Sequence, residues 1–351
     1  MADVICEPGE LKRFSREIFR KLGLSDEYAE IVGEVLIATD LRGISSHGVA
    51  RIPIYAKRIK MGLINPKPKV KTLKKNTTSA LLDADNGMGQ IASYQAMELC
   101  IKKAKEHGMG SVGVTNSNHF GINAFYSMMA SKENLIGMAF TNASPLMVPF
   151  GGSDKLLGSN PLSIAIPAGN EPDLVVDMAT SVTARGKIEI AARKGEKIPE
   201  GWALDSEGKA TVDPHKALSG ALLPVGGPKG YGLAIFVDIV SGIMTGSNFG
   251  KDCGSLFGDM ERPQNIGHFF MAINIENFME IKEFKDRMDC MIQNIKNSKK
   301  AVGFERIYMP GEIEYDKNME LLEKGIMVNE KVVNQLNELA ENLGIRDRLS
   351  N

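Results

Sequence analysis

A histidine, an arginine and a tyrosine follow one another at intervals of four residues near the start of the chain. His47, Arg51 and Tyr55 lie in SSHGVARIPIYAKRIKMG, where positions i, i+4 and i+8 would share one face of a helix. The planar guanidinium of Arg51 is suited to hold a small carboxylate through two hydrogen bonds. Because Arg58 lies nearby, a solvated basic face is equally compatible with the spacing alone.

A second candidate for chemistry is His119, in the stretch VTNSNHFGINAF between a predicted strand and a predicted helix. Open α/β sheets commonly place working residues at such positions, and an imidazole exchanges a proton with a reacting oxygen near neutral pH. The remaining three histidines lie in stretches without other candidate groups, so we interpret them as structural: His107, His215 and His268.

The stretch GMGQIA at residues 87–92 follows an apolar run and fits the glycine pattern of a dinucleotide-binding turn. Two features argue against that function. Asp83 and Asp85 precede the glycines and would repel a pyrophosphate, and the next predicted strand ends in Thr115 and Asn116 rather than in an acid. We therefore interpret the stretch as a tight loop before a helix and expect any nucleotide site elsewhere.

Two further glycine-rich stretches follow later in the chain, PFGGSDKLLGSNP at 149–161 and LPVGGPKGYG at 223–232. In the second, main-chain N–H groups could approach a phosphate while Lys229 supplies positive charge. The stretch lacks the G-x-x-x-x-G-K-[ST] pattern of phosphoryl-transfer loops, and an ordinary turn is an equal interpretation.

The periodicity predicts a central α/β domain and a helical part made from both ends of the chain. Helices are expected over residues 10–42, as a pair whose second member starts after Ser25 and ends at Gly43, and over 45–62, with a kink at Pro53. A basic connector over 64–76 is followed by strands at 79–84, 110–115 and 136–141, which alternate with helices at 93–106 and 122–132. Later elements are expected as strands at 162–167, 174–179 and 267–275, a buried helix at 229–244, and amphipathic helices from 278 onwards.

The composition indicates a soluble globular protein: 43% of the 351 residues are hydrophobic, 24% are charged, and the formal net charge is -1. This balance gives no electrostatic reason to expect nucleic acid, and neither a signal core nor a membrane span is predicted. We expect a cytoplasmic protein. Its four cysteines show no paired spacing, which argues against a zinc site or a disulfide framework.

Several stretches resemble one known family, in the order in which that family has them. They run from residue 42 to 312 and are RGISSHGVARIPIY, NHFG, PFGG with GSNPLSIAIP, VVDMATSVTARGK, DPHKAL, GGPKGYG and PGE. The family is that of malate/L-lactate dehydrogenases distinct from the Rossmann-type enzymes, which includes L-sulfolactate, ureidoglycolate and diketogulonate oxidoreductases and cyclic imine reductases. GKI followed by KIPEG, and GGPKGYGLA, are similar to stretches of archaeal L-sulfolactate/malate dehydrogenases.

The resemblance implies a homodimer in which each chain has two domains. A non-Rossmann α/β domain with a mixed sheet at 119–289 would bind a nicotinamide nucleotide, NAD or NADP. A helical substrate domain would comprise 1–118 with 290–351, and no metal is implied.

The resemblance also implies roles for individual residues. His119 and His47 would be the proton donor or acceptor, and Arg51, with Tyr55 and Ser46, would face the substrate. The implied cofactor contacts are Asp177, Met178, Ala179, Thr180, Ser181, Pro228, Lys229, Gly311 and Glu312.

The function expected from these observations is the interconversion of an L-2-hydroxy acid, malate or sulfolactate, and its 2-oxo acid. Two alternatives are a reductase of cyclic imines or diketo acids, and a nucleotide-binding module without turnover. A panel of 2-oxo acids assayed with NADH and NADPH distinguishes the three.

Overall fold

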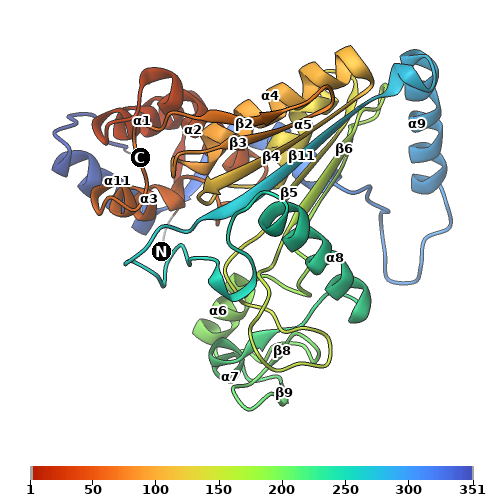
Figure 1. Ribbon diagram of the computed structural model, residues 1–351. Coiled ribbons are helices and arrows are strands. Elements are labelled where there is room, and N and C mark those ends of the chain that lie inside the picture. The colour runs from red at the N-terminus through yellow and green to blue at the C-terminus, as the bar shows by residue number, and fades with distance from the viewer. Residues whose placement is uncertain (1–2, 350–351) are drawn as a thin grey trace.

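A seven-stranded mixed sheet forms the centre of the chain, whose computed structural model describes residues 3–349 (Figure 1). β3 and β4 are parallel, and the other neighbouring pairs are antiparallel. This arrangement confirms the expected non-Rossmann α/β class. The strands lie in the order β2 (Lys71–Lys75), β3 (Ser79–Asp83), β4 (Met109–Ser117), β11 (Ile266–Asn274), β5 (Leu135–Thr141), β6 (Leu162–Ile166) and β7 (Leu174–Met178).

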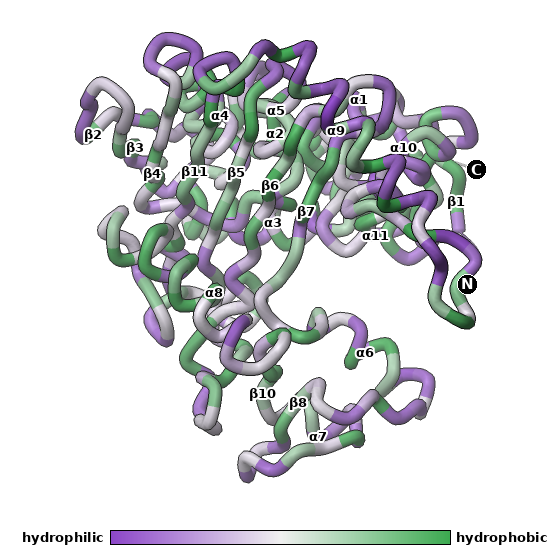
Figure 2. The backbone as a smooth tube through the Cα atoms, turned by 90° about the vertical axis from the view of Figure 1, so that its right-hand side faces the viewer, coloured by the Kyte–Doolittle hydropathy of each residue, from purple (hydrophilic) through white to green (hydrophobic). Residues whose placement is uncertain are grey.

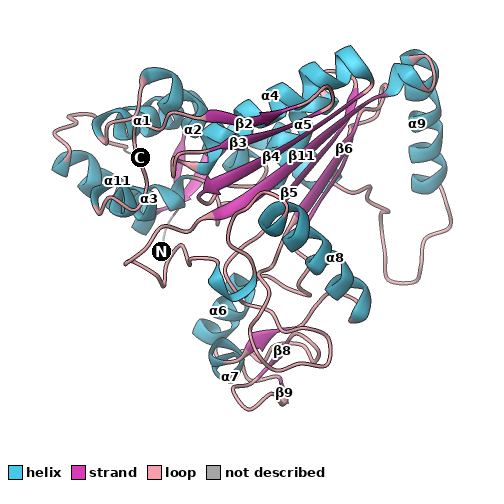
Figure 3. Cartoon of the chain, viewed as in Figure 1, coloured by secondary structure: helices cyan, strands magenta, loops and turns pink. Residues whose placement is uncertain are grey.

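Helices cover both faces of the sheet (Figure 3). On one face, α4 (Gly89–His107) and α5 (Asn123–Ser131) pack closely because the strands beneath them carry glycines. A Cβ on Gly110 would lie 2.2 Å from the carbonyl oxygen of Cys100, and one on Gly137 would lie 2.2 Å from that of Ser127. Only glycine permits this approach of helix and strand.

The other face is covered by α8 (Pro228–Asp238) and the π-helical turn η2 (Ile239–Ile243), which pack on Phe140 and Leu162. The sequence predicts a buried helix here, and that prediction is wrong for one side of it. Phe236 is 47% exposed and Ile243 is 54% exposed, so the helix buries one apolar face against the sheet and presents another outwards. An all-apolar helix lacks the periodicity that would have distinguished its two faces.

Both ends of the chain build the helical part, as the sequence predicts. β1 (Asp3–Cys6) pairs antiparallel with β12 (Ile326–Asn329), and the neighbouring helices share one apolar core. Figure 1 shows these helices together at one end of the sheet. They are α1 (Pro8–Lys21), α2 (Asp26–Leu41) and α3 (Ile52–Lys60) from the start of the chain, and α10 (Glu312–Lys324) and α11 (Glu330–Asn342) from its end.

A smaller group of elements lies away from the sheet, on the side that α8 covers (Figure 1 and Figure 2). It contains α6 (Arg185–Lys194), β8 (Ala203–Leu204), β9 (Ala210–Thr211), α7 (Pro214–Ser219) and β10 (Ala221–Leu222). The remaining elements are α9 (Ile281–Lys296), which packs on Ile166 and Leu174, and the 3-10 turns η1 (Val49–Arg51), η3 (Gly250–Asp252) and η4 (Ile275–Asn277).

Two local predictions are wrong. The basic connector expected at 64–76 contains the edge strand β2, whose five side chains are all exposed. With no side chain to bury, the strand shows no apolar alternation, and its lysines protect a sheet edge from pairing with other chains. The helix expected at 45–62 starts at Ile52, because Pro53 occupies its first turn.

The sheet takes strands from both sides of the domain boundary expected after residue 118. β4 ends at Ser117, and its neighbour β11 comes from the part of the chain assigned to the nucleotide-binding domain. The other expected boundary, at 289–290, falls inside α9. The division into two domains stays a prediction.

Candidate active site

The turn between α2 and α3 carries His47, and a buried carboxylate fixes its shape. Asp40, near the end of α2, accepts a 2.8 Å hydrogen bond from the main-chain N–H of Val49. Gly48 packs so closely that a Cβ there would lie 2.0 Å from Asp40 Oδ1. His47 is therefore in a turn ahead of α3, and its expected place on one helical face with Arg51 and Tyr55 is wrong.

The turn nevertheless brings the two candidate histidines together. The rings of His47 and His119 stack with centroids 5.5 Å apart and planes 28° apart. Nδ1 of His119 lies 2.6 Å from the hydroxyl of Tyr55, and Nδ1 of His47 lies 2.9 Å from the hydroxyl of Ser46. Four of the five expected proton-transfer and substrate residues thus form one contiguous cluster.

Both histidines are neutral near pH 7. Burial, followed by the positive charge of Arg51, lowers the pKa of His47 to about 4. Burial is also the main cause that holds the pKa of His119 well below its usual value, and His47 and Arg51 add to it. A neutral imidazole has a nitrogen lone pair that can accept a proton, and the positive charge of Arg51 makes it a weaker base than a free imidazole.

Arg51 has hydrogen-bonding capacity that the protein does not use. Its guanidinium lies over the ring of Phe257, 4.6 Å from the ring centroid, and its buried Nε has no partner among residues 3–349. Burial lowers the pKa of this guanidinium, but an arginine stays charged in a protein. An anion with two oxygens would satisfy it.

Arg58 is fully buried, so the alternative of a solvated basic face is wrong for this residue. Its guanidinium donates to main-chain carbonyls of the loop over residues 255–262, at 2.6 Å to Asp259 and 3.0 Å to Arg262. The same loop carries Phe257, and Gln264 just beyond it accepts a 3.0 Å hydrogen bond from the N–H of His119. The loop therefore forms one wall of the cluster.

The expected cofactor residues on β7 lie beside the expected residues at the start of α10. The N–H of Val175 donates to the carbonyl of Pro310 at 3.0 Å, and a Cβ on Gly311 would lie 2.7 Å from Val175 Cβ. Asp177, on the same strand, accepts from the N–H of Ala124 at the start of α5. Burial raises the pKa of Asp177 to about 6.

Glu312 differs from its neighbours, because its carboxylate is already occupied by the protein. It accepts from the N–H of Met309 at 2.8 Å and pairs with Lys296 and Arg306. The hydroxyls of Thr180 and Ser181 are likewise engaged by main-chain carbonyls of Ser159 and Thr183. Cofactor contacts at these positions stay predictions, and main-chain atoms are better placed to make them than these side chains.

The remaining expected cofactor residues, Pro228 and Lys229, start α8 next to the segment that follows β7. The N–H of Val182 donates to the carbonyl of Leu223 at 2.9 Å, and Ser181 bridges to Pro224. The helices α6 and α8 therefore both begin in this region. Neither start has a side-chain cap. The N–H groups of Lys187 and Gly230 donate to main-chain carbonyls, so within residues 3–349 the N–H groups left for a ligand are those of Arg185, Gly186 and Lys229.

These residues fit a nucleotide with phosphates. Uncapped helix starts attract anions, and Lys229, Arg185 and Lys187 add positive charge beside them. Buried polar atoms without partners among the described residues include both amide atoms of Asn123, next to the residue that donates to Asp177; Arg42 Nε, whose charge acts on Asp177; and Thr183 Oγ1, just before α6. Within residues 3–349, no three His, Cys, Asp or Glu side chains are grouped as metal ligands, and no helix is long and apolar enough to cross a membrane.

The glycine turn at residues 87–89 is filled by protein. A Cβ on Gly87 would lie 2.6 Å from Pro68 Cγ, and one on Gly89 would lie 2.0 Å from the carbonyl oxygen of Asn118. The turn therefore has no space for a pyrophosphate above its glycines, although it connects the parallel strands β3 and β4 through α4.

Sequence reasoning missed Asp40, Phe257 and Gln264. Each acts through a contact with a residue distant in the sequence or outside its own helix, for which periodicity gives no signal. The glycine next to His47 was the one usable sign, since a glycine beside a candidate histidine indicates a close approach by another group.

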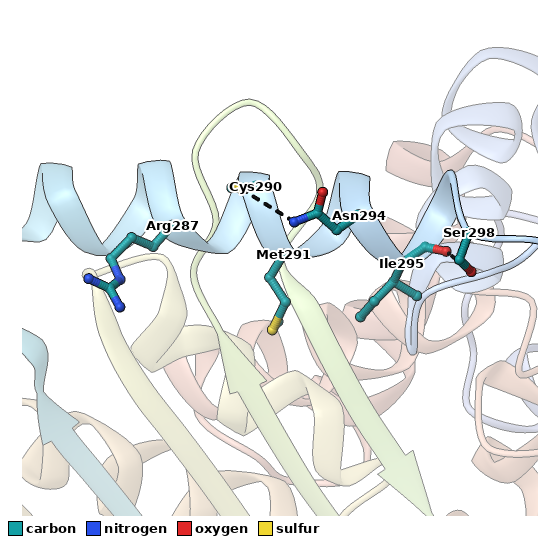
Figure 4. A pocket seen from close by; sticks show the side chains of 6 residues that line it. All are labelled: Arg287, Cys290, Met291, Asn294, Ile295 and Ser298. Atoms are coloured by element: carbon teal, nitrogen blue, oxygen red, sulfur yellow. Dashed lines mark hydrogen bonds between the residues drawn. The ribbon is translucent and has the colours of Figure 1, made fainter.

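Open grooves on the surface lie elsewhere. One runs along α9 and is lined by Arg287, Cys290, Met291, Asn294, Ile295 and Ser298 (Figure 4). Another lies between α3 and α11 and includes Lys57, Lys60 and Leu339. Neither groove is lined by a residue that the sequence assigns to the site.

Known proteins share the sequence pattern and the overall fold of this chain. The chain is 45% identical over 345 residues to a malate dehydrogenase of Pyrococcus abyssi, covering 96% of this chain and 94% of that protein. It is 44% identical to an L-sulfolactate dehydrogenase of Methanocaldococcus jannaschii, covering 97% and 98%. The solved structure of sulfolactate dehydrogenase from that organism superposes with a TM-score of 0.93 over 97% of this chain and 98% of the other. Residues 6–337 match the family model described as malate/L-lactate dehydrogenase, and the chain belongs to that family.

Proposed function

We propose that this protein is an NAD(P)-dependent dehydrogenase that interconverts an L-2-hydroxy acid, malate or sulfolactate, and its 2-oxo acid. The observation that carries the proposal is the pair of stacked, neutral histidines beside Arg51, whose buried Nε lacks a partner among the described residues. The names of the relatives, malate dehydrogenase and L-sulfolactate dehydrogenase, support this class of substrate.

Each group of the cluster then has a task. Arg51 holds the substrate carboxylate and so fixes the position of C2. His119 exchanges the proton with the C2 oxygen, and His47 orients the substrate or relays the proton. When bound, the nicotinamide accepts the C2 hydride in oxidation and donates a hydride in reduction.

The cofactor would lie along the segment 177–181, with the start of α10 on one side and the start of α8 on the other. Lys229 and the free N–H groups of the two helix starts would balance the phosphates. The sign of these charges suits both NAD and NADP. NADP carries an extra phosphate that needs a further cation, so activity assays with each nucleotide must distinguish the preference for NAD from that for NADP.

A dianionic substrate needs a second cation besides Arg51. Arg185 is part-buried at the start of α6, where it pairs with Glu189 at 3.3 Å, and Glu189 also acts on Arg51 through its charge. Lys187 and Lys229 are the other candidates. Loss of a hydrogen bond to a charged group costs on the order of 1–3 kcal/mol, so pyruvate, which lacks the second anion, should be disfavoured roughly 10- to 100-fold in kcat/KM.

The protein would act as a homodimer in the cytoplasm. The outward side of α8 and η2 exposes Leu233, Phe236, Ile239 and Ile243, together with the following Met244. A contiguous apolar surface of this kind is typical of subunit contacts. Four free cysteines, three of them buried, fit a reducing compartment.

The test is kcat/KM for oxaloacetate, sulfopyruvate and pyruvate with NADH and with NADPH. We expect either dianion to exceed pyruvate. If kcat/KM for pyruvate equals that for both dianions, the second cation is excluded but the dehydrogenase proposal stands. Turnover of cyclic imines alone would overturn the proposed substrate class. Nucleotide binding without any turnover would overturn the enzymatic proposal.

A further inference from the structure

The residue after Gly89 points a polar side chain into the protein interior. Gln90 is fully buried in the first turn of α4, where its Nε2 donates to the hydroxyl of Tyr55 at 3.3 Å. Tyr55 is also fully buried, and its expected contact with a substrate stays a prediction. The hydroxyl of Tyr55 is 2.6 Å from Nδ1 of His119, which completes a chain of three side chains.

The direction of the hydrogen bonds in this chain follows from a main-chain donor. The N–H of Gly121 also points at Nδ1 of His119, at 3.4 Å. A main-chain N–H cannot act as an acceptor, so Nδ1 must be the accepting nitrogen. Tyr55 then donates its proton to Nδ1 and accepts from Gln90. A neutral imidazole with an accepting Nδ1 carries its proton on Nε2.

We propose that Gln90 is a positioning residue that acts through Tyr55 to hold neutral His119 with its proton on Nε2, the nitrogen left for the substrate oxygen. This inference rests on the proposed function, because it assigns the substrate oxygen as the partner of Nε2. Gly89 contributes to the same arrangement. Because it has no side chain, the carbonyls of Asn118 and His119 can pack directly against the start of α4.

The amide of Gln90 also allows the hydrogen bonds between Gln90, Tyr55 and His119 to reverse their direction. In the arrangement above, Nε2–H of neutral His119 hydrogen-bonds a 2-oxo oxygen. The proton that the reduction consumes enters from solvent at Nδ1, and the resulting imidazolium gives its Nε2 proton to the developing alkoxide and keeps the proton on Nδ1. For oxidation Nε2 must accept, so the proton has to reside on Nδ1, which then donates to Tyr55. Tyr55 in turn needs an acceptor, and the buried Gln90 Oε1, which has no partner among residues 3–349, becomes that acceptor when the amide turns over.

A direct test observes the tautomer of His119 in the full-length protein labelled with 15N-histidine. Long-range 1H–15N correlation spectra distinguish protonation at Nε2 from protonation at Nδ1, and the His119 signals are identified by their loss in His119→Asn. We expect the Nε2–H form in the parent and a mixture of both forms in Gln90→Leu. In Gln90→Glu a carboxylate, which only accepts, should favour the Nδ1–H form.

Kinetics test whether Gln90 acts through Tyr55. We expect Gln90→Leu to lower kcat roughly 10- to 100-fold, with a smaller change in KM. This loss in kcat is at or below the usual effect of removing an acid–base group. The same substitution in a Tyr55→Phe background should have no further effect, since interactions in one chain are not additive. Ser93→Ala, one turn along α4 and equally buried, is the control for general damage to the helix.

The inference is overturned if the parent holds His119 as the Nδ1–H form, or if Gln90→Leu leaves both the tautomer and kcat unchanged. Additive losses in the double variant would also overturn it, because they indicate a purely structural role. If Gln90→Leu does not fold, Gln90→Met and Tyr55→Phe interrupt the same chain with side chains of similar size. The spectra need no turnover, so an unchanged tautomer pattern and an absence of activity with 2-oxo acids remain separate outcomes.

Discussion

The carboxylate of Asp40 and the main chain of Val49 are joined by a 2.8 Å hydrogen bond that spans the turn containing His47. Asp40 is 4% exposed, and burial raises its pKa to about 7. The folded state therefore binds the proton more tightly than the unfolded state, whose carboxyl has its ordinary pKa. As a result, the contribution of Asp40 to stability is greatest at low pH and falls as pH rises towards 7.

Asp40→Asn should remove this pH dependence while its side-chain oxygen still accepts from Val49. One pKa unit corresponds to about 1.4 kcal/mol, so the parent should lose about 2–3 kcal/mol of unfolding free energy between pH 5 and pH 8 that the variant keeps. Urea unfolding at the two pH values measures the difference. Asp347→Asn, at an exposed position, should behave like the parent, and equal pH dependence in both variants would contradict the assignment.

His119→Ala should lower kcat by about 100-fold or more, because the variant has no group to exchange the proton with the substrate oxygen. His107→Ala serves as the matched control, since that imidazole lies at the exposed end of α4. Steady-state kinetics with the best 2-oxo acid provide the measurement. Equal, modest losses in the two variants would exclude the assigned role of His119.

The oxidation reaction should stay active at unusually low pH. An imidazole must be neutral to accept the hydroxyl proton, and burial with Arg51 holds the pKa values of both site histidines below their ordinary range. The acid limb of kcat/KM, which reports the free enzyme, should therefore lie below pH 6.5. Arg51→Gln should move that limb upwards, and a parent limb above pH 6.5 would argue against neutral histidines.

Lys229→Ala should weaken nucleotide binding, because it removes positive charge from the start of α8. Gly89→Ala should lower stability instead, because its Cβ would lie 2.0 Å from the carbonyl oxygen of Asn118. Fluorescence titration with NADH and NADPH measures the first effect, and thermal unfolding measures the second. Loss of binding in a folded Gly89→Ala protein, with Lys229→Ala unaffected, would return the cofactor to the glycine turn.

Arg58→Met should loosen the loop over residues 255–262, because several main-chain carbonyls would lose their buried donor. The expected cost is about 1–3 kcal/mol in unfolding free energy. Because Phe257 contacts Arg51, KM should rise as well. Faster chymotryptic cleavage after the exposed Phe257 in the native protein would report the loop itself, and the cleavage rate of Arg58→Lys should fall between those of Arg58→Met and the parent. Unchanged cleavage in Arg58→Met would contradict the role of Arg58.

Most of the sheet was predictable, because buried strands such as β5 and β6 are short apolar runs. The edge strand β2 was not, since all five of its side chains are exposed. His47 and His119 could be found as candidates from their neighbours in the sequence. Their supports could not, because Gln90 is a polar residue inside an apolar helix turn, and Phe257 and Gln264 come from a loop whose path is fixed by Arg58.

The position of β11 has a consequence for the order in which the molecule forms. This strand lies between β4 and β5, with His268 opposite both Val114 and Thr141, although the chain makes it long after either neighbour. During synthesis, β4 and β5 therefore each have an unpaired edge until β11 has been made. Contacts of such long sequence separation also form slowly. His119 follows β4 directly, and Gln264, which accepts from its N–H, is made only when about three quarters of the chain has been synthesised, so the histidine pair lacks this support until then.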